Sequence, residues 1–148
     1  MQTQTINQGI SNKDVFVKMI LDEWQKQLSR FNKLFDTLSG EQLLMEIAPG
    51  RNTGIYLAGH LVAVHDGMLP LLGFGEKLYP QLENIFLTNP DKSGIAMPSA
   101  TELKKYRDEI DAKLSQHISQ LSPDEWFAKH NAVSAEDFEK EPHRNKLN

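Results

Sequence analysis

The chain contains no cysteine, and this absence excludes both a disulfide framework and a thiol nucleophile. A cysteine-free chain fits the reducing cytoplasm, where we expect the protein to reside. Several catalytic motifs are missing as well: the glycine-rich phosphate loop, the G-x-G-x-x-G dinucleotide fingerprint, the G-x-S-x-G nucleophile turn and the H-E-x-x-H zinc motif. The sequence therefore does not indicate the enzyme classes that these motifs mark.

Long runs of one charge or of apolar residues are also lacking. The 16 Lys and Arg residues are scattered among 20 Asp and Glu residues, and the formal net charge is −4. A nucleic-acid partner requires a basic patch, so we expect none. The polar N-terminus does not resemble a signal sequence, and no apolar run reaches the roughly 18 residues of a membrane span. We therefore expect no membrane association.

What the sequence does contain is a series of amphipathic segments with serine start signals. Ser11 and Asp14 can satisfy the first free N–H groups of a helix that should end near Leu38. Apolar residues repeat along this helix with alternating spacings of four and three, which is typical of near-antiparallel bundles. The predicted core line comprises Val17, Leu21, Trp24, Leu28, Phe31, Phe35 and Leu38.

The most apolar segment, residues 51–73, predicts the central helix of the fold. Asn52 or Thr53 is expected to cap its start, and Gly73 is expected to end it in the left-handed conformation. Asp66 lies opposite the apolar spacing, so we expect it to be exposed to solvent. The predicted core line of this helix comprises Leu57, Leu61, Val64, Met68 and Leu71.

A long connection, residues 74–98, follows the central helix. A connection of this length without function is uncommon, and we expect it to fold over one end of the bundle and border a cavity. Ser99 opens a third long helix that should end near Leu121, and shorter helices are predicted at 40–46 and from Ser122. The apolar face of the third helix comprises Leu103, Tyr106, Ile110, Leu114, His117 and Leu121.

These segments predict an all-α, up-down helical bundle in a single domain, residues 1–148. Residues 1–10 would form a flexible arm, and residues 129–148 a polar tail in which Pro142 begins a further helix. Three long helices leave apolar positions that need more cover, so we expect this further helix to be a truncated fourth one. A second copy of the chain would then cover the open face in a homodimer.

Three histidines lie on the predicted long helices. His60 and His65 fall about 60° and 80° to opposite sides of the central core line, and their spacing of five is unfavourable for binding one ion together. The small residues Ala63 and Gly67 leave room beside the ring of His60. His117 lies within an apolar stripe and is either a metal or proton-transfer residue or a core histidine with one hydrogen bond. The role of His65 stays open.

The sequence GHLVAVHD, followed by GMLPLLGFGEKLYP, resembles the second helix and following loop of the DinB-like (damage-inducible) four-helix-bundle proteins. In that family, a histidine on the second helix joins two histidines, spaced four apart on the fourth helix, around a divalent metal. His60 matches the first ligand by position, and the other two have no match before Asn148. The resemblance covers the chain from about Phe16 onward. It implies a three-histidine site for Zn or Ni that is incomplete in this chain, and a single imidazole would not hold either ion tightly.

Some DinB-like proteins are metal-dependent thiol transferases. The resemblance therefore implies a metal-dependent transferase or hydrolase with a small-molecule or thiol substrate. The alternative is a non-catalytic bundle that binds a small ligand or dimerises through its helix faces. The metal hypothesis expects the imidazole of His60 to face inward, toward the long axis of the bundle. A ring directed into bulk solvent would argue against it.

Overall fold

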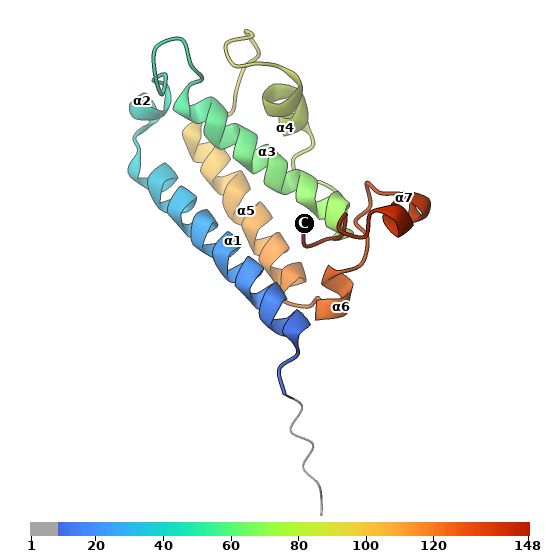
Figure 1. Ribbon diagram of the computed structural model, residues 1–148. Coiled ribbons are helices and arrows are strands. Elements are labelled where there is room, and N and C mark those ends of the chain that lie inside the picture. Colours follow the sequence, from blue (N-terminus) through green and yellow to red (C-terminus); the bar gives the residue numbers. More distant parts are fainter. Residues whose placement is uncertain (1–8) are drawn as a thin grey trace, which may run out of the picture.

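The computed structural model describes residues 9–148, which form a helical bundle with two isolated backbone bridges and three long helices (Figure 1). Most of the expected flexible arm, residues 1–8, lies outside the described residues. The elements in chain order are α1 (Asn12–Thr37), α2 (Gly40–Leu43), α3 (Gly54–Leu72), α4 (Gln81–Glu83), η1 (Asn84–Thr88), α5 (Ala100–Ile118), α6 (Pro123–Trp126) and α7 (Ala135–Lys140). The predicted all-α fold is thereby confirmed.

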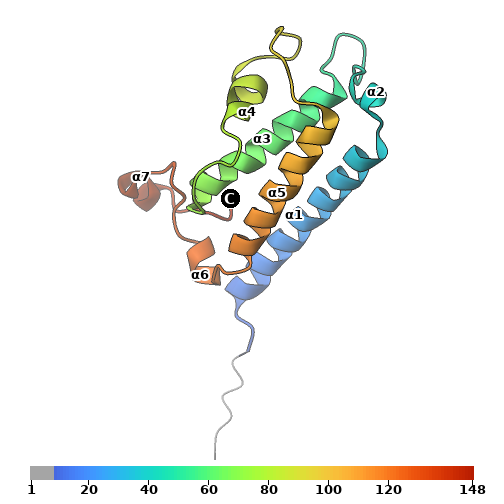
Figure 2. The same ribbon diagram turned by 180° about the vertical axis from the view of Figure 1, so that it is seen from behind.

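Helix α1 begins at the predicted residue and buries the predicted face. Ser11 and Asp14 form a reciprocal capping box, in which each side chain accepts a hydrogen bond from the backbone of the other residue. Val17, Leu28 and Phe35 of the predicted core line are buried. Two opposite views show α1, α3 and α5 lying alongside one another, and these helices form the body of the bundle (Figures 1 and 2).

Helix α5 starts with a second capping box, formed by Ser99 and Glu102. Three residues of its predicted apolar face are buried, and Tyr106 and His117 are half-buried. The fully enclosed residues on this face are Leu103, Ile110 and Leu114. Arg107, also on α5, is buried, and its guanidinium lies 3.1 Å from the carboxylate of Asp36 on α1. An ion pair therefore joins α5 to α1.

Helix α3 has the predicted caps but turns a different face to the core from the one predicted. Thr53 caps its start, and Gly73 ends it in the left-handed conformation. Leu61 and Val64 of the predicted core line are 40% and 41% exposed. The buried positions are instead Ile55, Tyr56, Ala58, Gly59, Val62, Ala63, Asp66, Leu69 and Leu72. The predicted line is wrong because α3 is apolar almost all round, so hydrophobic spacing does not specify its covered face.

Asp66 is the one charged residue within α3, and it is buried rather than solvated. The residue is only 1% exposed. Its carboxylate oxygens accept hydrogen bonds from the backbone N–H groups of Leu78, at 2.7 Å, and Tyr79, at 2.9 Å. The expectation of a solvent-exposed side chain is therefore wrong, because two backbone donors replace the water that burial removes. Asp66 fastens the connection after α3 to the helix itself.

The connection from Phe74 to Pro98 contains the two short helices α4 and η1. Leu82 and Phe86 within it are fully buried and belong to the hydrophobic core. Helix η1 has π-helical hydrogen bonding, which is rare and often occurs at functional sites. Figure 1 shows this segment lying against α3. The connection is therefore an integral part of the bundle and positions backbone groups next to α3.

The tail does not form the helix predicted from Pro142. Residues 141–148 form turns, and the short helix α7 lies before them. Backbone hydrogen bonds hold the tail against the rest of the fold: Asn131 N–H donates to Leu71 C=O at 2.9 Å, and Lys146 N–H donates to Ala128 C=O at 3.0 Å. The predicted helix does not form because the backbone of this segment pairs with an earlier part of the tail instead: an isolated bridge joins Lys129 and Asn145.

By length and composition alone, α3 is long and apolar enough to cross a membrane. This corrects the expectation that no segment reaches that length. Half of its most apolar window is buried inside the bundle, and its one charged residue is buried there as well. The core helix of a globular protein meets the same criterion, and we interpret α3 as such a helix.

Candidate metal site at His60

His60 lies on the flank of α3 and is exposed, so the prediction that its ring faces the bundle axis is wrong. One edge of the imidazole is nevertheless held by the protein. Its Nδ1 atom lies 2.9 Å from the backbone oxygen of Phe86 in η1. The ring is therefore not free in bulk solvent, because a contact between α3 and the connection fixes it.

The contact with Phe86 selects one tautomer of His60. A carbonyl oxygen can only accept a hydrogen bond, so Nδ1 must carry the proton. In the neutral ring, Nε2 is then unprotonated and keeps its lone pair. Metal-ligating histidines typically donate their other ring N–H to a carbonyl or carboxylate in this way. The contact between His60 Nδ1 and the Phe86 carbonyl is of this kind.

Two contacts that were not predicted from the sequence hold the Phe86 carbonyl in position beside His60. Gly59 faces the Phe86 ring so closely that a Cβ at this position would lie 2.3 Å from ring atoms. The hydroxyl of Tyr56, also on α3, donates to the Asn89 oxygen at 2.7 Å and lies 3.3 Å from the Phe86 oxygen. A glycine directly before His60 is the one sequence signal that another segment approaches closely here.

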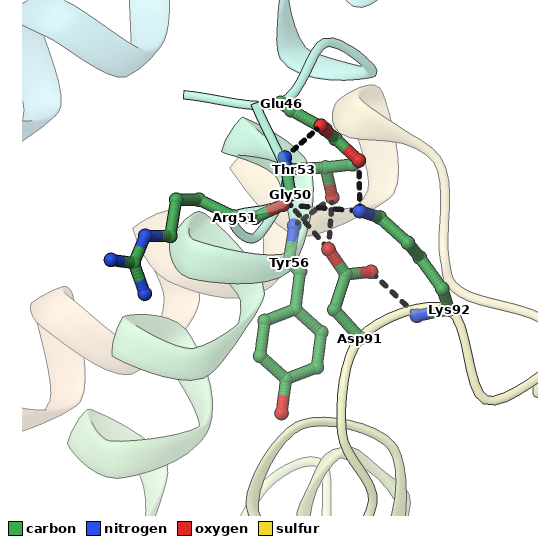
Figure 3. A network of polar contacts seen from close by, with 7 residues as sticks. All are labelled: Glu46, Gly50, Arg51, Thr53, Tyr56, Asp91 and Lys92. Carbon is green, nitrogen blue, oxygen red and sulfur yellow. Dashed lines mark hydrogen bonds and ion pairs between the residues drawn. The ribbon is translucent and has the colours of Figure 1, made fainter. Parts of the chain in front are cut away.

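A cavity of about 330 Å³ lies beside η1, so the connection borders a cavity as predicted. Figure 3 shows the polar network next to it. Asp91 accepts from the N–H and hydroxyl of Thr53, at 2.6 and 3.0 Å, and Lys92 is ion-paired with Glu46. Hydrogen bonds from Lys92 and then from the Gly50 N–H lower the pKa of Glu46. Because these groups satisfy one another, the network joins two loops rather than offering free ligands.

The other histidines are not brought to His60. The Nδ1 atom of His65 lies 3.3 Å from a carboxylate oxygen of Asp111, and the ring of His117 stacks on Phe74 with centroids 5.0 Å apart. Across residues 9–148, no group of three or more His, Cys, Asp or Glu side chains is arranged to hold a metal ion. The described fold therefore supplies His60 as a single candidate ligand.

Comparison with protein families places these features in a known group. The family model described as the DinB superfamily matches residues 23–144 of the 148-residue chain. The match includes α3, the connection with η1, and α5. A search of curated proteins found no match. Because the family match spans far more than half of the sequence, and the fold is helical throughout, the chain belongs to the DinB superfamily.

Proposed function

We propose that this protein is a metal-associated member of the DinB superfamily in which His60 supplies one imidazole ligand through Nε2. The observation that carries the proposal is the 2.9 Å contact between His60 Nδ1 and the Phe86 carbonyl, which leaves Nε2 unprotonated on an exposed residue. Family membership supports it, because the resemblance implies a histidine ligand at this position.

A single imidazole does not hold a divalent ion tightly, because zinc sites use three or four protein ligands. Among the described residues, His60 would supply one ligand to such an ion, and no cluster of three or more ligands is present. The other ligands would have to come from groups beyond this set, and we assign no reaction step to the ion. When three imidazoles hold Zn or Ni, the ion lowers the pKa of a bound water or thiol, which serves hydrolysis or thiol transfer.

This proposal restricts the substrate to a small molecule or thiol in the cytoplasm. The chain has no cysteine, so any reacting thiol would belong to the substrate. Tyr56, one helical turn before His60, lines the cavity of about 330 Å³ beside η1. His60 itself does not line that cavity, and Tyr56 connects the two along α3.

Titration with Ni²⁺, followed by NMR of the imidazole resonances, tests the role of His60. Nickel is paramagnetic, so we expect selective broadening of the His60 signals and of the backbone signals around Phe86, and we expect the Phe86 signals to stay sharp in the His60→Ala variant. His143→Ala, which removes an exposed histidine of the tail, is the control and should leave the His60 broadening unchanged. In the metal-free protein, the neutral His60 ring should carry its proton on Nδ1. Broadening that does not depend on His60 would contradict the proposal.

A second candidate function, non-catalytic binding, is favoured by two cavities along the groove between α1 and α3. They measure about 210 and 240 Å³ and share Phe31 and Leu61 in their linings.

The exposed residues Leu61 and Val64 on the same side would also suit the proposed homodimer, because a two-fold axis pairs identical apolar patches. Sedimentation velocity tests the dimer, and a monomer at all concentrations would contradict it.

A further inference from the structure

A second histidine, His65, lies at a cavity separate from the site of His60. The cavity has a volume of about 210 Å³ and lies between α1 and α3. Its lining residues are Trp24, Gln27, Leu28, Phe31, Leu61 and His65. Four of the six are apolar or aromatic, and three of the six, Trp24, Gln27 and His65, carry hydrogen-bonding side-chain groups. The cavity is therefore an apolar space with a small number of polar groups, which is typical of ligand pockets.

The imidazole of His65 is oriented by a chain of polar contacts across the bundle. Its Nδ1 atom lies 3.3 Å from one oxygen of Asp111 on α5, and both side chains are 15% exposed. The other Asp111 oxygen accepts from the side-chain amide of Asn32 on α1 at 3.2 Å. The side-chain oxygen of Asn32 is buried and has no hydrogen-bond partner among residues 9–148. Three helices thus meet at a small, nearly enclosed polar group.

This arrangement determines what His65 can offer a ligand. A carboxylate only accepts hydrogen bonds, so the contact with Asp111 keeps the proton of a neutral His65 on Nδ1. Nε2 is then an acceptor. His65 lines the cavity, with the ring of Trp24 tilted 55° to the imidazole at a centroid distance of 6.2 Å. The site therefore combines aromatic walls with one oriented acceptor.

We propose that this cavity binds a small, neutral, single-ring molecule whose hydroxyl group donates a hydrogen bond to Nε2 of His65. The cavity is partly open to solvent, and its volume of about 210 Å³ gives space for one substituted ring. The carboxylate of Asp111 behind the imidazole disfavours an anion. A phenol-type ligand meets both requirements, because it has an aromatic body and one neutral donor.

This site does not depend on the proposed role of His60. His65 and His60 lie on different sides of α3, and their Nδ1 atoms contact different elements, α5 and η1. Loss of metal association would leave the His65 site intact. The probe for it is an organic molecule and not an ion, so failure of one proposal is distinguishable from failure of the other.

Binding of p-cresol and toluene, measured by calorimetry and by NMR of the histidine side chains, tests the proposal. The two probes share a ring and a methyl group, and only p-cresol has a hydroxyl donor. We expect saturable binding of p-cresol, a shift of His65 Nε2, and a preference over toluene of about tenfold, which one hydrogen bond in an apolar site provides. His65→Phe should abolish this preference.

Two further variants keep the test decisive. His117→Phe changes a histidine outside the cavity and should preserve the preference for p-cresol. Leu61→Trp enlarges a 40% exposed lining residue and should block both probes without unfolding the bundle, even if His65→Phe does not fold. Equal affinity for the two probes, absence of saturable p-cresol binding, or a preference that survives in folded His65→Phe protein would overturn the proposal.

Discussion

The two faces of α3 differ in how many residue types each position can accept. On the inward face, Gly59 meets the Phe86 ring and Asp66 receives two backbone N–H groups. On the outward face, Leu61 and Val64 remain about two-fifths exposed. The inward face therefore requires particular residue types, whereas the outward face is defined only by being apolar.

This difference shows that hydrophobicity and burial are separate properties in this helix. The more regular apolar line, which includes Leu61 and Val64, is largely uncovered, while the buried face contains a glycine and a carboxylate. A helix that is apolar all round can be covered from any direction. Specific contacts with the connection, and not hydrophobic spacing, decide which face of α3 turns inward.

The largest effect is expected from Asp66→Ala on the inward face. The substitution removes the acceptor of the N–H groups of Leu78 and Tyr79, and hydrogen bonds to a charged group contribute about 1.5–3 kcal/mol each. We expect the free energy of unfolding to fall by about 3 kcal/mol in urea denaturation. Asp66→Asn keeps one acceptor oxygen and should lose less. A loss below about 1 kcal/mol would show that Asp66 does not fix this face.

The next effect is expected at Gly59. A methyl group there overlaps the Phe86 ring, and overpacking a core costs about 1–3 kcal/mol. Gly59→Ala should therefore be less stable and should also alter the NMR signals of His60, since the Phe86 carbonyl moves. Gly67→Ala is the matched control on the same helix, where nothing lies near the added methyl group. This control should gain up to about 1 kcal/mol from helix propensity.

Polar substitutions on the outward face should have little effect on a monomer. We expect Leu61→Gln and Val64→Gln to change the free energy of unfolding by no more than about 0.5 kcal/mol each, because these residues are already partly solvated. Chemical denaturation combined with sedimentation velocity provides the measurement. A loss of unfolding free energy that grows with protein concentration would instead show that another copy of the chain covers this face. Both faces of α3 would then be buried.

The smallest effect is expected at the start of α5, away from both faces. Hydrogen bonds from the backbone N–H and then the hydroxyl of Ser99 lower the pKa of Glu102 below its ordinary 4.5. Because the folded-state pKa is the lower one, the stabilisation is present above pH 4.5 and is lost as the pH falls through the folded value. The melting temperature of Glu102→Gln should therefore change less with pH in this range. An identical acid profile would contradict this.

The sequence predicted the helices well because their start signals are local. The capping box of Ser11 and Asp14, and that of Ser99 and Glu102, depend on residues three apart and form wherever the helix begins. The core line of α1 was equally predictable from the sequence, since the opposite face of this helix carries polar residues. Helix α3 lacks such marks, so its covered face could not be predicted from periodicity.

The candidate site was predicted less completely because its partners are distant in the sequence. The position of His60 followed from the family resemblance, and its role as a metal ligand stays a prediction. Its contact with Phe86 depends on a π-helical turn 26 residues later, for which the sequence NIFLT gives no signal. The burial of Asp66 likewise depends on two backbone N–H groups of the connection, and the positions of backbone groups cannot be predicted from a pattern of side chains.

Because Asp66 holds the backbone of Leu78 and Tyr79, the long connection behaves as two shorter loops, one before and one after this anchor. The stretch from Gly73 to Leu78 is short and pinned at both ends, so an inserted residue there would pull the backbone away from the carboxylate. The stretch around Gly94 lies beyond the anchor, where extra length adds only a small entropic penalty that grows logarithmically. A peptide tag or reporter grafted at Gly94 should accordingly leave the bundle intact.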